Sequence, residues 1–216
     1  MKKLIIFDLD GTLLDTIADL GTSVNIALRK HGFPEHDIET YRFMVGNGLT
    51  KLIERALPDD QRDVFVIEQV KQTFLNHYLP HSGDYTKPYP GIQELLLKLQ
   101  NQGIRMAVAS NKVHEATEKV VAHFFPSIHF DIVLGQREGI PTKPDPSILF
   151  SILAHTGCNA NETLYVGDSG VDVVTATNAG IAFTGVLWGF RPKEELASFG
   201  ATSFVSTPKE ILSLLK

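Results

Sequence analysis

Three aspartates in this 216-residue sequence stand where buried structure would not normally tolerate them. Asp8 and Asp10 follow the apolar run "LIIF" at once, and Asp168 follows the apolar run "LYVG". An ionised carboxylate near an apolar strand costs several kcal/mol unless a cation or hydrogen-bond donors compensate for it. Carboxylate oxygens are the ligands that Mg²⁺ prefers, and Mg²⁺ commonly bridges to substrate phosphate. The three aspartates therefore predict a magnesium site, with Asp8 ionised and aimed at an electrophile.

A second group of residues offers hydrogen-bond donors for a phosphoryl group. Gly11 and Thr12 provide backbone N–H groups in a tight turn, Ser110 provides a hydroxyl, and Lys143 provides an ammonium from the stiff segment "TKPDP". Asp172 lies four residues after Asp168, one helical turn further on the same face, which suits an outer contact to the metal. Alone, each has a simpler interpretation, such as a turn residue or a solvated loop lysine.

The elements that must position these side chains alternate along the second half of the chain. Short apolar strands are expected in the segments "IRMAVAS", "FDIVLG", "TLYVGDS" and "IAFTGVL", and helices at 91–102, 113–124, 146–156 and 170–179. This alternation predicts a doubly wound, Rossmann-like α/β domain whose parallel sheet is covered on both faces. Ligands bind beyond the carboxyl ends of such strands, where Asp8, Asp10, Ser110, Asn111 and Asp168 stand.

An all-helical insertion is expected after the first strand. Apolar residues recur at helical spacing over 16–31, and further helices are expected near 48–57 and 60–79. The segment "PHSGDYTKPYPG" then breaks the pattern. We therefore predict an α/β core domain formed by residues 1–15 and 86–216, with a helical cap domain at 16–85.

Composition restricts the class of protein. The formal charge of −5, without a basic run, gives no support to nucleic-acid or membrane-surface binding. No segment approaches the ~20 apolar residues of a membrane span. The single cysteine cannot form an internal disulfide. A cytoplasmic protein that acts on a small molecule is therefore expected, and both a monomer and a homodimer remain open.

The motifs "FDLDGTLLDT", "VASNK", "TKPDP" and "GDSGVDVVTATNAG" resemble, in order, the four motifs of the haloacid dehalogenase superfamily of phosphohydrolases. The resemblance implies that Asp8 is the nucleophile and a magnesium ligand, and that Asp168 is a second ligand. Asp10 would give its backbone carbonyl to the metal and act as general acid and then as base. The phosphoryl group would be bound by Ser110 and Lys143.

The same resemblance extends to the neighbouring residues and to the inserted helices. Gly11, Thr12 and Asn111 would contribute to the phosphate site, and Asp172 would support the metal site from outside its ligand shell. The helical insertion corresponds to the cap that closes over the site in this superfamily and selects the substrate.

Shorter motifs resemble the phosphoglycolate phosphatase branch of this superfamily. These are "VGNG", "KPYPG" and "GVLWGFR". They imply 2-phosphoglycolate as the substrate, with its carboxylate bound by Gly46, Asn47 and Gly48 at the start of a cap helix. The same three residues could equally form only a turn before that helix.

Other functions remain alternatives at this point. Another small phosphate, such as pyrophosphate, a sugar phosphate or a nucleotide, could be the substrate. A sugar phosphomutase is a further alternative, although Leu20 and Leu49 stand where that branch carries a His and an Arg. Outside the enzymes, a non-catalytic phosphate-binding sensor would share the site but lack turnover.

Overall fold

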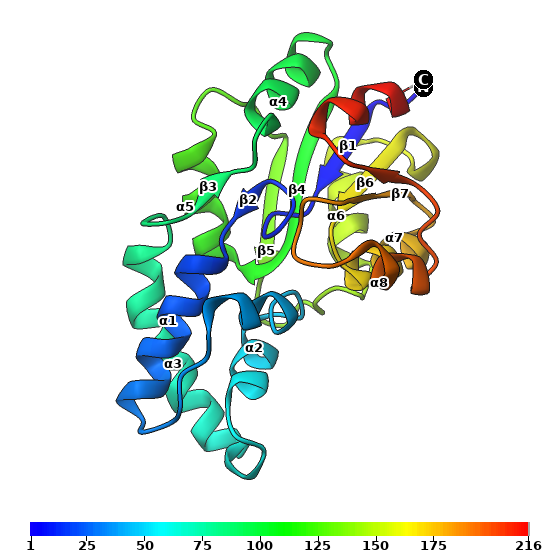
Figure 1. Cartoon of the computed structure of the whole chain (residues 1–216). Coiled ribbons are helices and arrows are strands. Elements are labelled where there is room, and N and C mark those ends of the chain that lie inside the picture. Colours follow the sequence, from blue (N-terminus) through cyan, green and yellow to red (C-terminus); the bar gives the residue numbers. More distant parts are fainter. Residues whose placement is uncertain (216) are drawn as a thin grey trace.

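A parallel sheet of six strands forms the centre of the computed structural model, which describes residues 1–215 (Figure 1). The strand order is β5-β4-β1-β6-β7-β8, and every pairing in the sheet is parallel. The strands are β1 (Leu4–Phe7), β4 (Arg105–Val113), β5 (Ile132–Gln136), β6 (Thr163–Gly167), β7 (Ala182–Val186) and β8 (Phe204–Val205).

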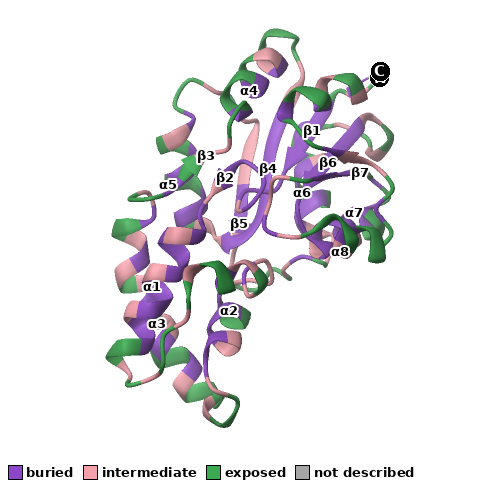
Figure 2. Cartoon of the chain, viewed as in Figure 1, coloured by how far each residue is buried: buried purple, intermediate pink, exposed green. Residues whose placement is uncertain are grey.

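Helices cover both faces of this sheet. The helices α4 (Ile92–Asn101) and α5 (His114–Phe124) and the 3-10 segment η4 (Pro208–Leu215) pack on one face, and α6 (Ser147–Thr156) and α7 (Gly170–Ala179) pack on the other. A shorter helix, α8 (Lys193–Ser198), contacts α7. The strands are apolar runs because both of their faces are buried, as Figure 2 shows for β1 and β4. The predicted fold class is confirmed.

The strand order places the predicted site at the point where the chain reverses direction across the sheet. From β1 the chain adds β4 and β5 on one side, and it then crosses over to add β6, β7 and β8 on the other. Phe7, the last residue of β1, is paired with Val108 of β4 and with Val166 of β6. Asp8 therefore leaves β1 between the carboxyl ends of its two neighbours, which is where open α/β sheets bind ligands.

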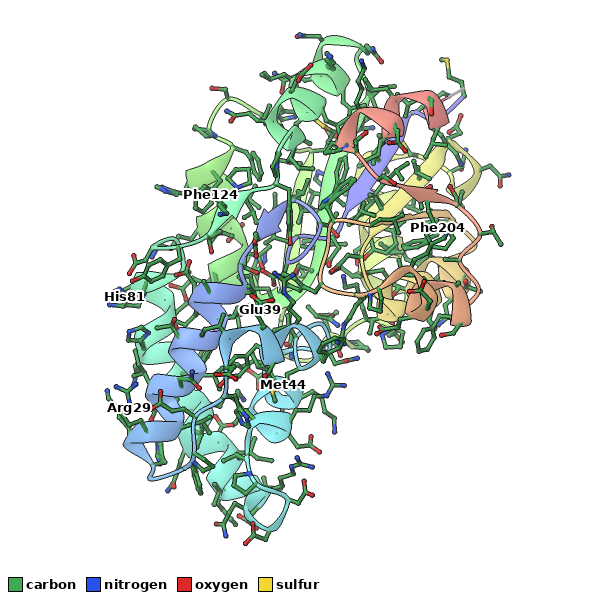
Figure 3. All side chains as sticks on the ribbon, viewed as in Figure 1. Arg29, Glu39, Met44, His81, Phe124 and Phe204 are labelled. Carbon is green, nitrogen blue, oxygen red and sulfur yellow. The ribbon has the colours of Figure 1, made fainter. Side chains whose placement is uncertain are left out.

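A helical segment lies between β2 (Leu14–Asp15) and β3 (Lys87–Pro88), which pair with each other antiparallel. It consists of the helices α1 (Ile17–Lys30), α2 (Leu49–Ala56) and α3 (Val64–His81), with the 3-10 turns η1 (Ile38–Phe43) and η2 (Asp59–Gln61) between them. These elements bury a second hydrophobic cluster, which Ala116 and Phe190 join from the sheet domain. The segment extends away from the sheet, and Arg29, near the end of α1, lies well away from the strands (Figure 3). The domain bounds given above stay a prediction.

The third helix of this segment differs from the expected range of 60–79. It begins later, because the side chain of Asp63 accepts a hydrogen bond from the N–H of Phe65 and caps the helix at that point. It also continues through Pro80 to His81.

Among the described residues, no helix is long and apolar enough to cross a membrane.

Asp19 of α1 connects the helical segment to the returning chain. Its buried carboxylate accepts hydrogen bonds from the N–H of Tyr85 at 3.0 Å and from the N–H and hydroxyl of Thr86 at 2.8 and 2.6 Å. These three donors lie just before β3. The carboxylate therefore connects the segment in which the chain enters the helices to the segment in which it returns to the sheet. Asp19 is therefore structural.

We predict that Asp19→Ala lowers the free energy of unfolding by about 2–3 kcal/mol, because it leaves the two buried donors of Thr86 and the part-buried N–H of Tyr85 without an acceptor. Urea titration followed by circular dichroism measures this loss. Asp84→Ala is the matched control, since Asp84 is exposed and its carboxylate bonds only to His81. An equal loss in both variants would contradict the anchoring role.

Candidate active site

Three of the predicted carboxylates meet beyond the carboxyl ends of β1 and β6. Asp8, Asp168 and Asp172 are all buried, and each offers an oxygen that lies within 4.8 Å of one from each of the others. Asp10 does not join them through its side chain. Its carboxylate accepts hydrogen bonds from the hydroxyl of Thr16 at 2.7 Å and from the ammonium of Lys112 at 2.8 Å. A metal contact through the backbone carbonyl of Asp10 stays a prediction.

The electrostatics of this cluster favour a bound cation. Burial raises the pKa of Asp8 to about 7, and the nearby Asp172 adds to this rise. Burial and the charge of Asp8 likewise raise the pKa of Asp168 well above its ordinary value. Both shifts mean that negative charge here is under-compensated by the protein alone. A hard divalent cation fits this oxygen-only donor set, and it would remove the penalty that raises both pKa values.

Lys143 supplies the positive charge that the protein places inside the cluster. Its ammonium donates to Asp8 and to Asp172, at 2.8 Å in each case. It also contacts the carbonyl of Ala109 at 3.0 Å and the hydroxyl of Tyr165 at 2.9 Å. Although burial alone would lower the pKa of Lys143, the two carboxylates raise it above its ordinary value. The lysine therefore stays charged beside the predicted nucleophile.

Asp172 acts mainly on Lys143 and on the start of α7. One of its oxygens accepts from Lys143 and from the hydroxyl of Tyr165, and the other accepts from the hydroxyl and N–H of Ser169. Burial alone would raise the pKa of Asp172, but Lys143 and these donors together lower it below its ordinary value. With both oxygens so engaged, Asp172 orients the lysine, and its predicted support of the metal would be indirect.

Asn111 holds the loop that carries Lys143. Its side-chain oxygen accepts from the N–H of Lys143 at 2.8 Å, and its amide nitrogen donates to the carbonyl of Lys143 at 2.9 Å and to that of Gly46 at 3.0 Å. The side chain of Asn111, which was predicted to bind phosphate, thus joins three segments of the chain.

Ser110, in contrast, lines the cavity described below, and its oxygen accepts from the N–H of Lys112 at 3.2 Å. The hydroxyl of Ser110 therefore keeps its proton for another acceptor.

The expected role of Gly11 and Thr12 as backbone donors is corrected by the structure. The N–H of Gly11 donates to the carbonyl of Leu14 at 2.9 Å, and that of Thr12 donates to the carbonyl of Leu9, so both are used within the turn. Gly11 is needed for a different reason. Its φ is +87°, and a Cβ atom there would lie 2.2 Å from an oxygen of Asp168. This glycine makes room for the carboxylate.

A cavity separates the carboxylate cluster from the helical segment. The volume of this cavity is about 60 Å³. Asp8, Asp10, Ser110, Lys143 and Asp168 line it from the sheet, and Leu20, Leu49, Leu52, Phe74 and Tyr78 line it from the helices. Polar groups thus face an apolar wall across a space that holds only a few water-sized groups.

The predicted cap loop reaches this cavity only in part. Gly46 and Gly48 line it, whereas the side-chain oxygen of Asn47 accepts from Arg55 at 2.8 Å and Asn47 lies in a separate hollow. The carbonyl groups of Val45 and Gly46 accept hydrogen bonds from Arg191 and Asn111. Binding of an anion by this loop stays a prediction, and it would fall to Gly46 and Gly48.

Several residues of the site were not identified from the sequence. Lys112 pairs with Asp10, and Tyr165 donates to Asp172. Phe190 lines the cavity, and its N–H donates to an oxygen of Asp168 at 2.7 Å. Lys112 stands directly after Ser110 and Asn111 in "SNK", so its place in a motif was the available signal. Phe190 lies within the motif "GVLWGFR", which was a signal of the same kind. Tyr165 carried no such signal, because an aromatic residue within a buried strand usually belongs to the core.

Comparison with known proteins gives a family and a set of relatives. Residues 5–186 match the family model described as "Haloacid dehalogenase-like hydrolase". The chain is 30% identical to a phosphoglycolate phosphatase of Aquifex aeolicus over 214 residues, which cover 99% of this chain and 96% of the relative. It is 34% identical to a phosphoglycolate phosphatase of Pseudomonas syringae pv. syringae over 201 residues, covering 91% of this chain and 74% of the relative.

Solved structures agree with the fold. A protein of Lactobacillus delbrueckii subsp. bulgaricus, 31% identical, superposes with a TM-score of 0.93 and covers 100% of this chain and 99% of its own. A predicted phosphoglycolate phosphatase from Haemophilus somnus, 27% identical, has a TM-score of 0.91 and covers 100% of this chain and 98% of its own. Both likenesses extend over the sheet and the helical segment together.

We predict that Lys143→Met lowers the free energy of unfolding by about 3–5 kcal/mol in metal-free buffer, because it leaves Asp8 and Asp172 buried without their shared cation. Urea titration in the presence of EDTA measures this. Lys209→Met provides the matched control, since Lys209 is exposed. Unchanged stability of Lys143→Met would show that the buried carboxylates do not depend on this ammonium.

Proposed function

The chain belongs to the haloacid dehalogenase-like hydrolases, and we propose that it is a magnesium-dependent phosphatase acting on a small phosphate monoester, 2-phosphoglycolate in particular, through an aspartyl-phosphate intermediate. One observation carries the proposal. The predicted nucleophile Asp8 lies in a buried carboxylate cluster, bonded to Lys143, at the floor of a small cavity. The names of the relatives in Aquifex and Pseudomonas support the choice of substrate.

The proposed reaction uses the residues of the sheet in two steps. A carboxylate oxygen of Asp8 attacks phosphorus, the bond from phosphorus to the ester oxygen breaks, and Asp10 gives a proton to the departing oxygen. Water, deprotonated by Asp10, then attacks the aspartyl phosphate, which releases phosphate and restores Asp8. Ser110 and Lys143 bind the phosphoryl oxygens throughout. Mg²⁺, held by Asp8, Asp168 and the carbonyl of Asp10, would neutralise charge on the phosphoryl group.

The shape and lining of the cavity support a small substrate. A space for a few water-sized groups suits phosphoglycolate or pyrophosphate better than a nucleotide. Leu20 and Leu49 both line the cavity and offer neither an acid–base group nor a cation for a sugar, which disfavours the phosphomutase alternative. A non-catalytic sensor would not need Asp10 beside the nucleophile.

We predict that the wild-type protein releases phosphate from 2-phosphoglycolate faster than from pyrophosphate, glucose 6-phosphate or AMP, and that Asp8→Asn abolishes release from all four. Enzymes accelerate phosphate-monoester hydrolysis by up to ~10²¹-fold, so loss of the nucleophile should be close to total. A phosphate-release assay measures this, with the exposed Asp60→Asn as control and circular dichroism to verify folding. A tenth of wild-type activity in Asp8→Asn would exclude the covalent mechanism.

We further predict that chelation with EDTA removes activity and that added Mg²⁺ restores it. Asp168→Ala should raise the Mg²⁺ concentration needed for half-maximal activity by tenfold or more, because it removes a charged oxygen ligand. Activity is measured against Mg²⁺ concentration in both proteins. Full activity in excess EDTA would show that no metal takes part.

A further inference from the structure

Tyr78 of α3 has a feature that the proposed reaction does not explain. Its side chain is buried and lines the cavity, and its hydroxyl, which lies beside the ammonium of Lys112, has no acceptor for its own proton among residues 1–215. Burial raises the pKa of Tyr78 to about 12, so the hydroxyl keeps its proton and remains a donor at neutral pH. A buried hydroxyl donor without an acceptor is costly, and such groups are uncommon unless a ligand or water completes them.

Lys112 of β4 lies beside this hydroxyl and is also incompletely used. Its side chain is only 3% exposed, and its ammonium donates to one oxygen of Asp10 at 2.8 Å. The ammonium also lies 4.8 Å from the centroid of the Tyr78 ring. An ammonium carries three donors, and within the described part of the chain it uses them on one oxygen of Asp10 and on the hydroxyl of Tyr78. At least one donor of Lys112 therefore remains for a group in the cavity, which Lys112 lines.

The other described side chains of the helical wall offer nothing to a charged group. Leu20, Leu49, Leu52 and Phe74 line the cavity around Tyr78. In such apolar surroundings, a second anionic group on the substrate needs a nearby cation and a donor to replace its water. Lys112 and Tyr78 supply one of each at the same place. They are separate from Ser110 and Lys143, which serve the phosphoryl group in the proposed reaction.

We propose that Lys112 and Tyr78 form a second anion subsite that binds the carboxylate of the substrate and selects phosphate esters that carry one. This inference rests on the proposed function, and it assigns the recognition of phosphoglycolate to two side chains besides the cap loop at Gly46 and Gly48. The ammonium of Lys112 donates to the substrate carboxylate and to Asp10 together. The hydroxyl of Tyr78 donates to the other carboxylate oxygen.

The test compares phosphoglycolate with ethyl phosphate, which has the same phosphoryl group and two carbons but no carboxylate. We expect Tyr78→Phe and Lys112→Met each to lower the ratio of kcat/KM for phosphoglycolate to that for ethyl phosphate by about tenfold or more, chiefly through KM. Lys112→Arg should retain part of the ratio, because it keeps the charge. Tyr41→Phe is the matched control, since the hydroxyl of Tyr41 is buried in the helical segment but donates to Asn25, away from the cavity.

The outcomes separate this inference from the function on which it rests. An unchanged ratio in Tyr78→Phe and Lys112→Met, with both esters still hydrolysed, would overturn the subsite and leave the phosphatase intact. No hydrolysis of either ester by the wild-type protein would overturn both. If Lys112→Met fails to fold, Tyr78→Phe decides alone, because it removes a single oxygen. An equal fall of the ratio in Tyr41→Phe would also overturn the subsite, since the effect would then not be specific to the cavity.

Discussion

The structure depends most on the placement of three buried carboxylates around one ammonium, which bonds to two of them. Lys143 bonds to Asp8 and Asp172, while Asp168 receives only the N–H of Phe190 among the described hydrogen bonds. Negative charge therefore exceeds positive charge at the end of an apolar sheet, where water cannot disperse it. The raised pKa values of Asp8 and Asp168 express this excess. This excess of negative charge favours the binding of a divalent cation. A bound cation would then attract the phosphoryl group of a substrate.

Arginine side chains from both the helical segment and the sheet domain make contacts across the boundary between them. Arg191, which follows β7, donates to the carbonyl groups of Phe43 and Val45, and its guanidinium lies over the ring of Phe43. In the reverse direction, Arg42 lies over the ring of Phe190. Each side of the boundary thus contributes one arginine that lies over an aromatic ring of the other side. These contacts hold the apolar wall of the cavity opposite Asp8.

Much of the fold follows from the sequence, because strands buried on both faces are continuous apolar runs and their polar ends coincide at one edge of the sheet. The hydrogen bonds of individual residues do not follow in this way. Along a regular strand, Asn111 and Lys112 would face opposite sides. The pairing of β4 with β5 is irregular between Ala109 and Val113, and Ser110, Asn111 and Lys112 are all buried near the site. The alternation of side chains between the two faces of the sheet, on which the sequence pattern of a strand depends, is therefore lost in this part of β4.

The sheet and the helical segment line the cavity with groups of different kinds. The charged groups that line the cavity come from the sheet and its loops, and the helical wall among the described residues is apolar apart from backbone groups and the hydroxyl of Tyr78. In such surroundings, a single donor or charge decides whether a polar substrate group can enter, since an unpaired polar group there costs about 1–3 kcal/mol. Selectivity in this chain would therefore depend on very few side chains, and the chemistry proposed for Asp8 would stay unchanged while they vary.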